Sequence, residues 1–206
     1  MNILDPIRSS VRAVMHNIAK GLNAATGGNL SPNAVTITGL LAHIPIALAI
    51  ADQKFVLASV LLVIFGLFDA LDGELARLQK RASASGMLLD ASTDRMKEII
   101  LYIGISYYLI ADGQQFAAVW AVAACGFSVL VSYVKAKGET AIAKSNLSTH
   151  EINYLFQDGL MNFEARMTVL IVGLLSGHVA TAVIVVAIGA FLNAIKRLVN
   201  ISQKIG

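Results

Sequence analysis

Six apolar segments run through this chain of 206 residues, and most of them have the length that a helix needs to cross a bilayer. A hydrocarbon core about 30 Å thick requires roughly 20 helical residues. Six such spans leave no room for a separate soluble domain, so residues 1–206 are predicted to form a single all-α, polytopic membrane domain. The predicted spans within residues 34–198 are Ala34–Ala51, Phe55–Leu78, Gly86–Ala111, Gln115–Val134, Phe163–Leu175 and Val179–Leu198.

The composition and the placement of charge agree with a membrane protein. Hydrophobic residues make up 56% of the chain and charged residues only 14%, against about 25% charged in soluble domains. Of the 16 Lys and Arg residues, all except Lys54 fall on one side of the six-span model. Positive charge is enriched in cytoplasmic loops. We therefore predict a multi-pass protein of the cell membrane whose termini and active site face the cytoplasm, with no nucleic-acid partner.

The segment before the first span has the pattern of an amphipathic helix. Apolar residues recur at helical spacing from Asp5 to Leu22, with basic residues between them. This pattern is typical of a helix that lies in the membrane interface. Residues 5–22 are therefore predicted to form an interfacial helix, followed by a loop over residues 25–33 that is rich in Gly, Asn and Ser.

Four aspartates stand near the ends of two consecutive spans. Asp69 and Asp72 are three residues apart, and Asp90 and Asp94 are four apart, so each pair shares one face of its helix. The connection over residues 78–85 turns the chain back, which lets the two pairs face each other. An acidic side chain within a span costs roughly 2.5–3.5 kcal/mol. Carboxylates without His or Cys favour a hard cation, Mg²⁺ or Mn²⁺.

An alternative is that these aspartates are helix-end charges paired with nearby basic side chains. That alternative gives no reason for the glycines at positions 73 and 86. Gly73 follows Asp72 directly, and a glycine weakens a helix by about 1 kcal/mol relative to alanine. It is favourable where a ligand approaches the backbone. Arg77, one turn later, is placed to contact a phosphate or a nucleotide.

The stretch from Asp69 to Asp94 resembles the signature of the CDP-alcohol phosphatidyltransferase family. All of its fixed positions are present: Asp69, Asp72, Gly73, Ala76, Arg77, Gly86, Asp90 and Asp94. The resemblance implies six transmembrane helices with an N-terminal interfacial helix in a homodimer, surrounded by membrane lipids. It also implies a magnesium-dependent transfer of a phosphatidyl group from a CDP-linked lipid donor to an alcohol acceptor, with release of CMP.

The same resemblance assigns roles to individual residues. Asp69, Asp72 and Asp90 would bind one or two magnesium ions, and Asp94 would act as the general base while approaching the second ion. The residues that would contact the CDP-alcohol are Asn33, Ala34, Val35, Thr36, Gly73, Arg77, Ser83 and Gly86.

The acceptor is predicted from basic residues outside the signature. Four of them resemble the acceptor-binding positions of the branch that uses inositol phosphate: Lys135, Lys137, Arg166 and Arg197. Several cations in one pocket suit a phosphorylated alcohol. The sequence departs from that branch at Lys137, where an arginine is usual, and keeps the pattern around Glu164 and Arg166 only in part. The alternative is ordinary positive charge at the cytoplasmic surface.

Inositol phosphate is the predicted acceptor, and glycerol 3-phosphate, which suits a similar anion pocket, is the second candidate. A non-enzymatic membrane carrier, with the aspartates as a cation path, is the alternative of another class. A carrier of that kind predicts acidic residues along the depth of several spans, whereas the four aspartates lie at one level on two helices.

Overall fold

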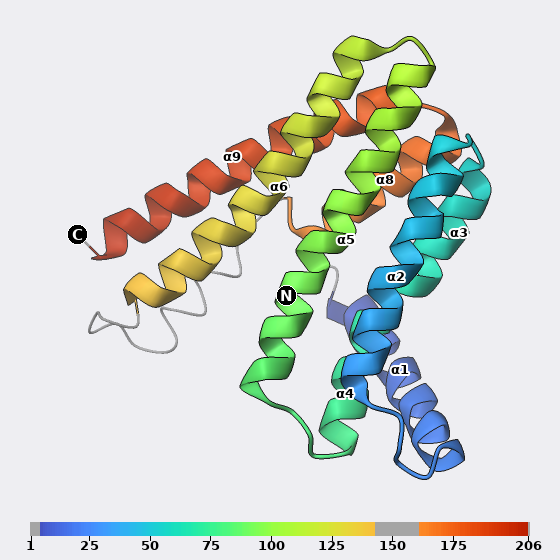
Figure 1. Ribbon diagram of the computed structural model, residues 1–206. Coiled ribbons are helices and arrows are strands. Elements are labelled where there is room, and N and C mark those ends of the chain that lie inside the picture. The colour runs from blue at the N-terminus through green and yellow to red at the C-terminus, as the bar shows by residue number, and fades with distance from the viewer. Residues whose placement is uncertain (1–4, 143–160, 206) are drawn as a thin grey trace. The chain divides into compact units, whose positions relative to one another are not determined.

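The structure, a computed structural model, describes residues 5–142 and 161–205. Within those ranges every regular element is an α-helix, which confirms the predicted all-α class (Figure 1). The helices are α1 (Asp5–Ala25), α2 (Pro32–Ala51), α3 (Phe55–Gly66), α4 (Phe68–Leu78), α5 (Ala84–Ala111), α6 (Gln115–Ile142), α8 (Phe163–Ser176) and α9 (Val179–Ile205).

Among the described residues, four segments are long and apolar enough to cross a membrane: Pro32–Ala51, Phe55–Leu78, Gln115–Ile142 and Val179–Gln203. They make the chain a membrane protein. The other two predicted spans lack that length or composition. In α5 the charged residues between Asp90 and Glu98 leave an apolar part, residues 99–111, that is shorter than roughly 20 residues. The helix α8 has only 14 residues.

The chain forms two compact units. The first contains α1, α4, most of α2 and α3, and the larger, N-terminal part of α5, up to Leu101. The second contains the remainder of α5 with α6, α8 and α9.

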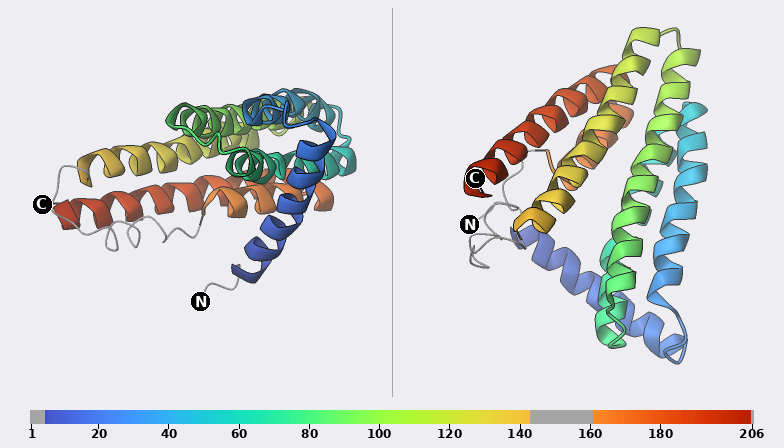
Figure 2. Two further views of the ribbon diagram at one scale, coloured as in Figure 1. Left: turned by 90° about the horizontal axis from the view of Figure 1, so that it is seen from below. Right: turned by 60° about the vertical axis from the view of Figure 1, so that its left-hand side comes forward.

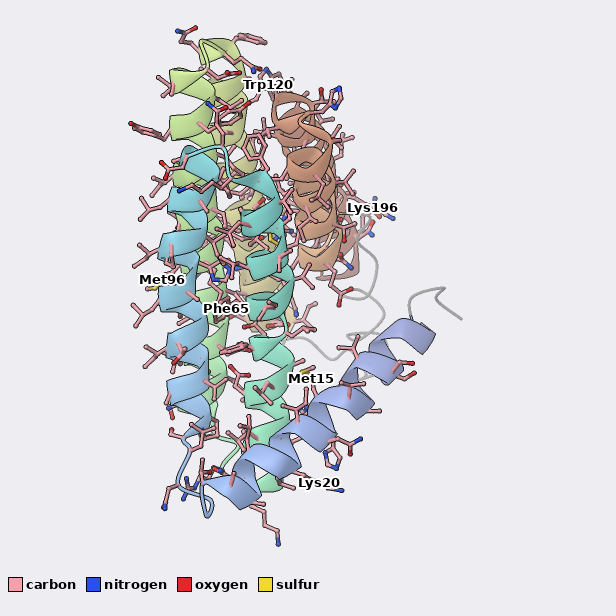
Figure 3. The ribbon with its side chains drawn as sticks, turned by 90° about the vertical axis from the view of Figure 1, so that its right-hand side faces the viewer. Met15, Lys20, Phe65, Met96, Trp120 and Lys196 are labelled. Atoms are coloured by element: carbon pink, nitrogen blue, oxygen red, sulfur yellow. The ribbon has the colours of Figure 1, made fainter. Side chains whose placement is uncertain are left out.

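In the first unit, α1 packs across α4 (Figure 2). Buried apolar side chains join the two helices, among them Met15 and Ala19 of α1 and Leu71 and Leu75 of α4. Met15 lies on the side of α1 that faces α4, whereas Lys20 points away from it (Figure 3). The predicted amphipathic helix is thus present, and it continues three residues beyond Leu22.

A local irregularity separates α3 from α4, where the sequence predicted one continuous helix. Leu67 lies between them with helical backbone angles of φ −76° and ψ −14°. Its N–H donates to the Ile64 carbonyl at 3.3 Å, three residues back, which is a bond of the tighter 3₁₀ type. The change in hydrogen bonding falls two residues before Asp69, so this aspartate, a predicted metal ligand, lies in the first turn of a new helical segment.

In the second unit, α6 and α8 both pack on α9, and α6 runs alongside α9 (Figure 2). The predicted end of the fourth span near Val134 is too early, since α6 continues to Ile142. Val134, Ile142 and Ile201 form a buried cluster, so packing against α9 extends the helix through a polar stretch. Ser148 and Glu151 have the spacing of a capping box, which predicts a short helix after α6. These two residues lie outside the described residues.

Gly173 allows close packing of α8 against α9. A Cβ atom at this position would overlap with the Cβ of Ala182 and lie 3.4 Å from the His178 carbonyl oxygen. We expect Gly173→Ala to destabilise the protein by about 1–3 kcal/mol, measured as a lower thermal midpoint in detergent. The control is Gly126→Ala on α6, where a new Cβ meets nothing within 4 Å and stability should stay equal or rise. An unchanged midpoint for Gly173→Ala would contradict the close contact.

Candidate metal and donor site

The helices α4 and α5 bring three of the four signature aspartates together. Asp69 and Asp72 lie in the first turns of α4, and Asp90 lies in the second turn of α5. One carboxylate oxygen from each lies within 4.8 Å of the other two. The facing arrangement predicted from the reversal of the chain at residues 78–85 is therefore present for this set.

The surroundings of these carboxylates fit a bound divalent cation. Asp90 Oδ1 is buried and has no hydrogen-bond partner among the described residues. Asp72 is 6% exposed and accepts a hydrogen bond of 2.5 Å from the Thr36 hydroxyl. A buried anionic oxygen without a partner costs free energy, which a cation would offset. An all-oxygen set of ligands suits Mg²⁺ or Mn²⁺.

Asp94 lies outside this group of three and contacts basic side chains instead. Its Oδ1 is 3.3 Å from the Lys97 ammonium, and its Oδ2 is 3.8 Å from Arg95 Nη2. Lys97 is buried and also pairs with Asp69. Lys97 is not among the site residues predicted from the sequence. Its position three residues after Asp94, on the same face of the helix, is the signal that was available.

A cleft of about 270 Å³ opens beside the aspartates, in the first unit. Asp72 and Asp90 form part of its wall. Six of the predicted donor-binding residues also line it: Asn33, Thr36, Gly73, Arg77, Ser83 and Gly86. The other two do not. Ala34 is exposed outside the cleft, and Val35 is buried in the core between α1 and α4.

A side chain at either signature glycine, Gly73 or Gly86, would meet a different group at the cleft. Ser83 precedes α5 and accepts a hydrogen bond of 3.1 Å from the Gly86 N–H, as helix-capping serines do. A Cβ at Gly86 would lie 3.2 Å from that serine oxygen and 3.7 Å from Asn33 Oδ1. A Cβ at Gly73 would meet Arg77 Nη2 at 3.5 Å. Both glycines therefore keep side chains out of the cleft wall.

Glu74, which the sequence analysis missed, is the buried partner of Arg77. The Arg77 guanidinium donates to Glu74 Oε1 at 2.7 Å. His16 Nδ1 lies 3.2 Å from Oε2, and Arg12 Nε lies 3.9 Å from Oε1. Since Arg12 and His16 belong to α1, this carboxylate joins α1 to the arginine of the cleft.

The sequence-based prediction that Arg77 contacts a CDP-lipid donor can be tested through Glu74: if it holds, Glu74→Gln should weaken donor binding more than it slows the predicted reaction. Loss of the charge leaves Arg77 poorly held, and a hydrogen bond to a charged group contributes about 1.5–3 kcal/mol. We expect roughly a tenfold rise in the KM for the CDP-lipid with kcat changed much less. The control is Asp52→Asn, which disrupts an exposed pair with Lys54 and should change neither constant. A fall in kcat alone would contradict a role in holding Arg77.

The four predicted acceptor-binding cations all lie in the second unit, but in two different environments. Lys135 and Lys137 are exposed on the last turns of α6. Arg166 and Arg197 are buried, at 1% and 7% exposure. Each of these arginines donates to a backbone carbonyl, of Met161 and Val131 respectively, at 3.0 and 3.1 Å. Side-chain burial therefore separates the arginines from the surface lysines.

Further polar groups lie buried in the apolar helices of the second unit. Ser128 Oγ, Asn193 Oδ1 and Arg197 Nε have no hydrogen-bond partner among the described residues. The Asn193 amide donates to the Met161 carbonyl at 3.2 Å, the same oxygen that Arg166 uses. Ser128 and Asn193 are not among the site residues predicted from the sequence. The available signal was a polar side chain inside a predicted span, which is costly unless it has a function.

Residues 29–202 match the family model of CDP-alcohol phosphatidyltransferase. The chain is 31% identical over 142 residues to a phosphatidylinositol phosphate synthase of Cutibacterium acnes. The aligned residues make up 67% of this chain and 66% of that protein. This chain is 25% identical over 182 residues to an archaetidylinositol phosphate synthase of Methanothermobacter thermautotrophicus, covering 85% of each.

The fold has solved counterparts. The crystal structure of Mycobacterium tuberculosis phosphatidylinositol phosphate synthase with CDP-DAG bound has a TM-score of 0.77 to this chain, at 22% identity over 92% of this chain and 94% of that one. The same protein in complex with manganese and citrate has a TM-score of 0.78, at 22% identity over 92% and 89% of the two chains. The family model spans most of the residues, from before α2 into α9, and includes all four signature aspartates. The chain therefore belongs to the CDP-alcohol phosphatidyltransferase family of enzymes.

Proposed function

We propose that this chain transfers a phosphatidyl group from a CDP-diacylglycerol-like donor to inositol phosphate, releasing CMP in phospholipid synthesis. The observation that carries the proposal is the meeting of Asp69, Asp72 and Asp90 beside a cleft lined by Arg77 and both signature glycines. The cleft also borders the N-terminal turns of α2 and α5, where backbone N–H groups favour phosphate.

The proposed reaction forms one phosphorus–oxygen bond and breaks another. Asp94 accepts the proton of the acceptor hydroxyl, as a general base. The hydroxyl oxygen then attacks the donor phosphorus that bears the lipid, and the bond from that phosphorus to CMP breaks, with its electron pair leaving on CMP. Arg77 holds the donor phosphates during this exchange.

Asp69, Asp72 and Asp90 would hold the divalent cation, Mg²⁺ or Mn²⁺. The ion supplies positive charge that stabilises the pyrophosphate and the charge developing on it. The crystal structure of the Mycobacterium protein in complex with manganese supports a divalent cation in this fold. The protein itself would position the ligands of the ion. The Thr36 hydroxyl orients Asp72, and the buried Oδ1 of Asp90, which has no hydrogen-bond partner among the described residues, would be available as a ligand.

The proposal includes six membrane spans in a single domain. The four apolar segments are joined by α5, whose charged first turns would reach the surface, and by the short α8. Polar side chains near a span end can extend to the interface. On this topology α1 lies in the interface and both termini and the aspartates face the cytoplasm, where the basic residues cluster. A homodimer is the proposed assembly.

The proposed acceptor site is the buried polar group of the second unit, around Arg166 and Arg197. Phosphate on the acceptor would pair with the guanidiniums, and the buried atoms of Ser128 and Asn193 are suited to hydroxyl groups of a polyol. The two relatives compared above are named as synthases of phosphatidylinositol phosphate and archaetidylinositol phosphate. Both lipids carry an inositol phosphate head group, which favours that acceptor over glycerol 3-phosphate and over a phosphatidylglycerolphosphate synthase. Family membership favours the enzyme over a cation carrier.

Purified protein should be tested with CDP-diacylglycerol and Mg²⁺ against a panel of acceptors: inositol 1-phosphate, glycerol 3-phosphate, inositol and serine. CMP release is the measurement. We expect turnover with inositol 1-phosphate and little with the unphosphorylated alcohols. Turnover with glycerol 3-phosphate alone would replace the proposed acceptor. Cation transport without CMP release on any acceptor would overturn the enzymatic function.

Arg197→Gln should raise the KM for the phosphorylated acceptor. A buried guanidinium that pairs with phosphate contributes about 1.5–3 kcal/mol, which corresponds to roughly 10- to 100-fold. The KM for the CDP-lipid should stay unchanged. The adjacent Lys196 is exposed on α9 (Figure 3), so Lys196→Gln removes the same charge as a matched control and should have no effect. Equal effects from the two variants would argue against a specific acceptor contact.

A further inference from the structure

Lys97 is a buried amine inside the aspartate cluster, and the signature does not include it. The residue is 1% exposed. Its ammonium pairs with carboxylates on two helices, Asp69 of α4 and Asp94 of α5. A third helix contributes to its position, because a Cβ at Gly39 of α2 would lie 3.8 Å from Lys97 Cε and 3.9 Å from its nitrogen. The ammonium is therefore packed into a defined place rather than free to leave.

Both oxygens of Asp94 already face cations that the chain itself supplies. The Lys97 Nζ atom is 3.3 Å from Asp94 Oδ1, and the Arg95 Nη2 atom is 3.8 Å from Asp94 Oδ2. The three carboxylates that converge, those of Asp69, Asp72 and Asp90, do not include Asp94. A metal ion placed between Asp94 and Asp69 would need the oxygens that Lys97 occupies, and it would bring two positive charges against a buried ammonium.

We propose that Lys97 is the resident cation of this cluster: it occupies the position between Asp69 and Asp94, so that without donor the site binds one divalent ion, through Asp69, Asp72 and Asp90. Lys97 is then a positioning residue that holds Asp94 away from the metal. The inference rests on the proposed function in one respect, since it takes the aspartates as the metal site.

The test is the number of Mn²⁺ ions bound by the full-length protein in detergent, without donor, measured from the spectroscopic signal of free Mn²⁺. The wild-type chain should bind one ion tightly. Lys97→Met keeps the length and the apolar stem of the side chain but removes the charge, so it should gain a second bound ion per chain. The separate variant Lys97→Arg keeps the positive charge, so the protein should still bind one ion per chain. Lys54→Met, at an exposed lysine, is the matched control and should not differ from wild type.

Two results would overturn the inference while leaving the metal site intact. One is a wild-type chain that binds two ions per chain without donor. The other is a folded Lys97→Met variant that binds one ion as the wild type does. The wild-type count is a test on its own, because two ions per chain would overturn the inference even where Lys97→Met lowers the thermal midpoint too far for binding to be measured.

A third result would separate failure of the proposed function from failure of this inference. Asp90→Asn should remove the single tight ion, because it neutralises one of the three converging carboxylates. A wild-type chain that binds no Mn²⁺, or an Asp90→Asn variant that binds it unchanged, would overturn the proposed metal site and with it the role of Lys97.

Discussion

Asp94→Asn should abolish turnover while the protein still binds its CDP-lipid donor. Asparagine has nearly the same shape as aspartate but cannot accept a proton at neutral pH, so the acceptor hydroxyl would lose its base. General-base catalysis contributes about 10²–10⁴-fold, and we expect a loss of that size in CMP release. Donor affinity should persist because Asp94 does not line the cleft. Steady-state assays and equilibrium binding of a CDP-lipid measure the two effects separately.

The control for this variant is Asp112→Asn, which alters an exposed carboxylate in the turn after α5. It should keep wild-type turnover. If Asp94→Asn retains a near-normal rate, Asp94 is not the base. If turnover and donor binding fall together, the side chain contributes to the binding of the donor or the metal instead.

Asp90→Asn should remove both the divalent ion and the activity. Its Oδ1 is buried without a partner among the described residues, so none of the described groups compensates the charge on that oxygen. A metal ion contributes several kcal/mol of charge stabilisation in the transition state, and we expect a loss of about 10³-fold in CMP release, since each 1.36 kcal/mol is tenfold. The affinity for Mn²⁺ should fall in parallel.

The stability of Asp90→Asn gives an independent check. Without metal, replacing a half-buried carboxylate that has one buried oxygen without a partner among the described residues by a neutral amide should leave the thermal midpoint equal or higher, because burying charge is costly. Added Mg²⁺ should then raise the midpoint of the wild type but not that of the variant. Equal stabilisation by Mg²⁺ in both proteins would mean that the ion binds elsewhere.

The helices and the aspartate site were largely predictable from the sequence because both depend on local spacing. Apolar runs bounded by polar turns located α2, α5 and α8 to within a few residues. The three- and four-residue spacings placed each pair of aspartates on one helix face. The meeting of Asp69, Asp72 and Asp90 followed from one reversal of the chain, over residues 78–85.

The features that the sequence analysis missed depend on contacts between segments that are distant in the chain. The extension of α6 to Ile142 reflects packing against Ile201 on α9, which the polar composition after Val134 obscures. Glu74 occupies a variable position of the signature, and its role depends on His16, 58 residues away. Lys97 had the spacing to meet Asp94, but its pairing with Asp69 requires the packed helices.

The division of the chain into two units has a consequence for how such enzymes diversify. All the residues proposed for the metal and the donor fall between positions 33 and 94, whereas the proposed acceptor contacts fall between positions 128 and 197. A lineage could therefore acquire a new head group through substitutions in the C-terminal half alone, with the nucleotide chemistry inherited unchanged. For protein engineering, chimaeras joined near residue 101 are the natural starting point for changing the lipid product.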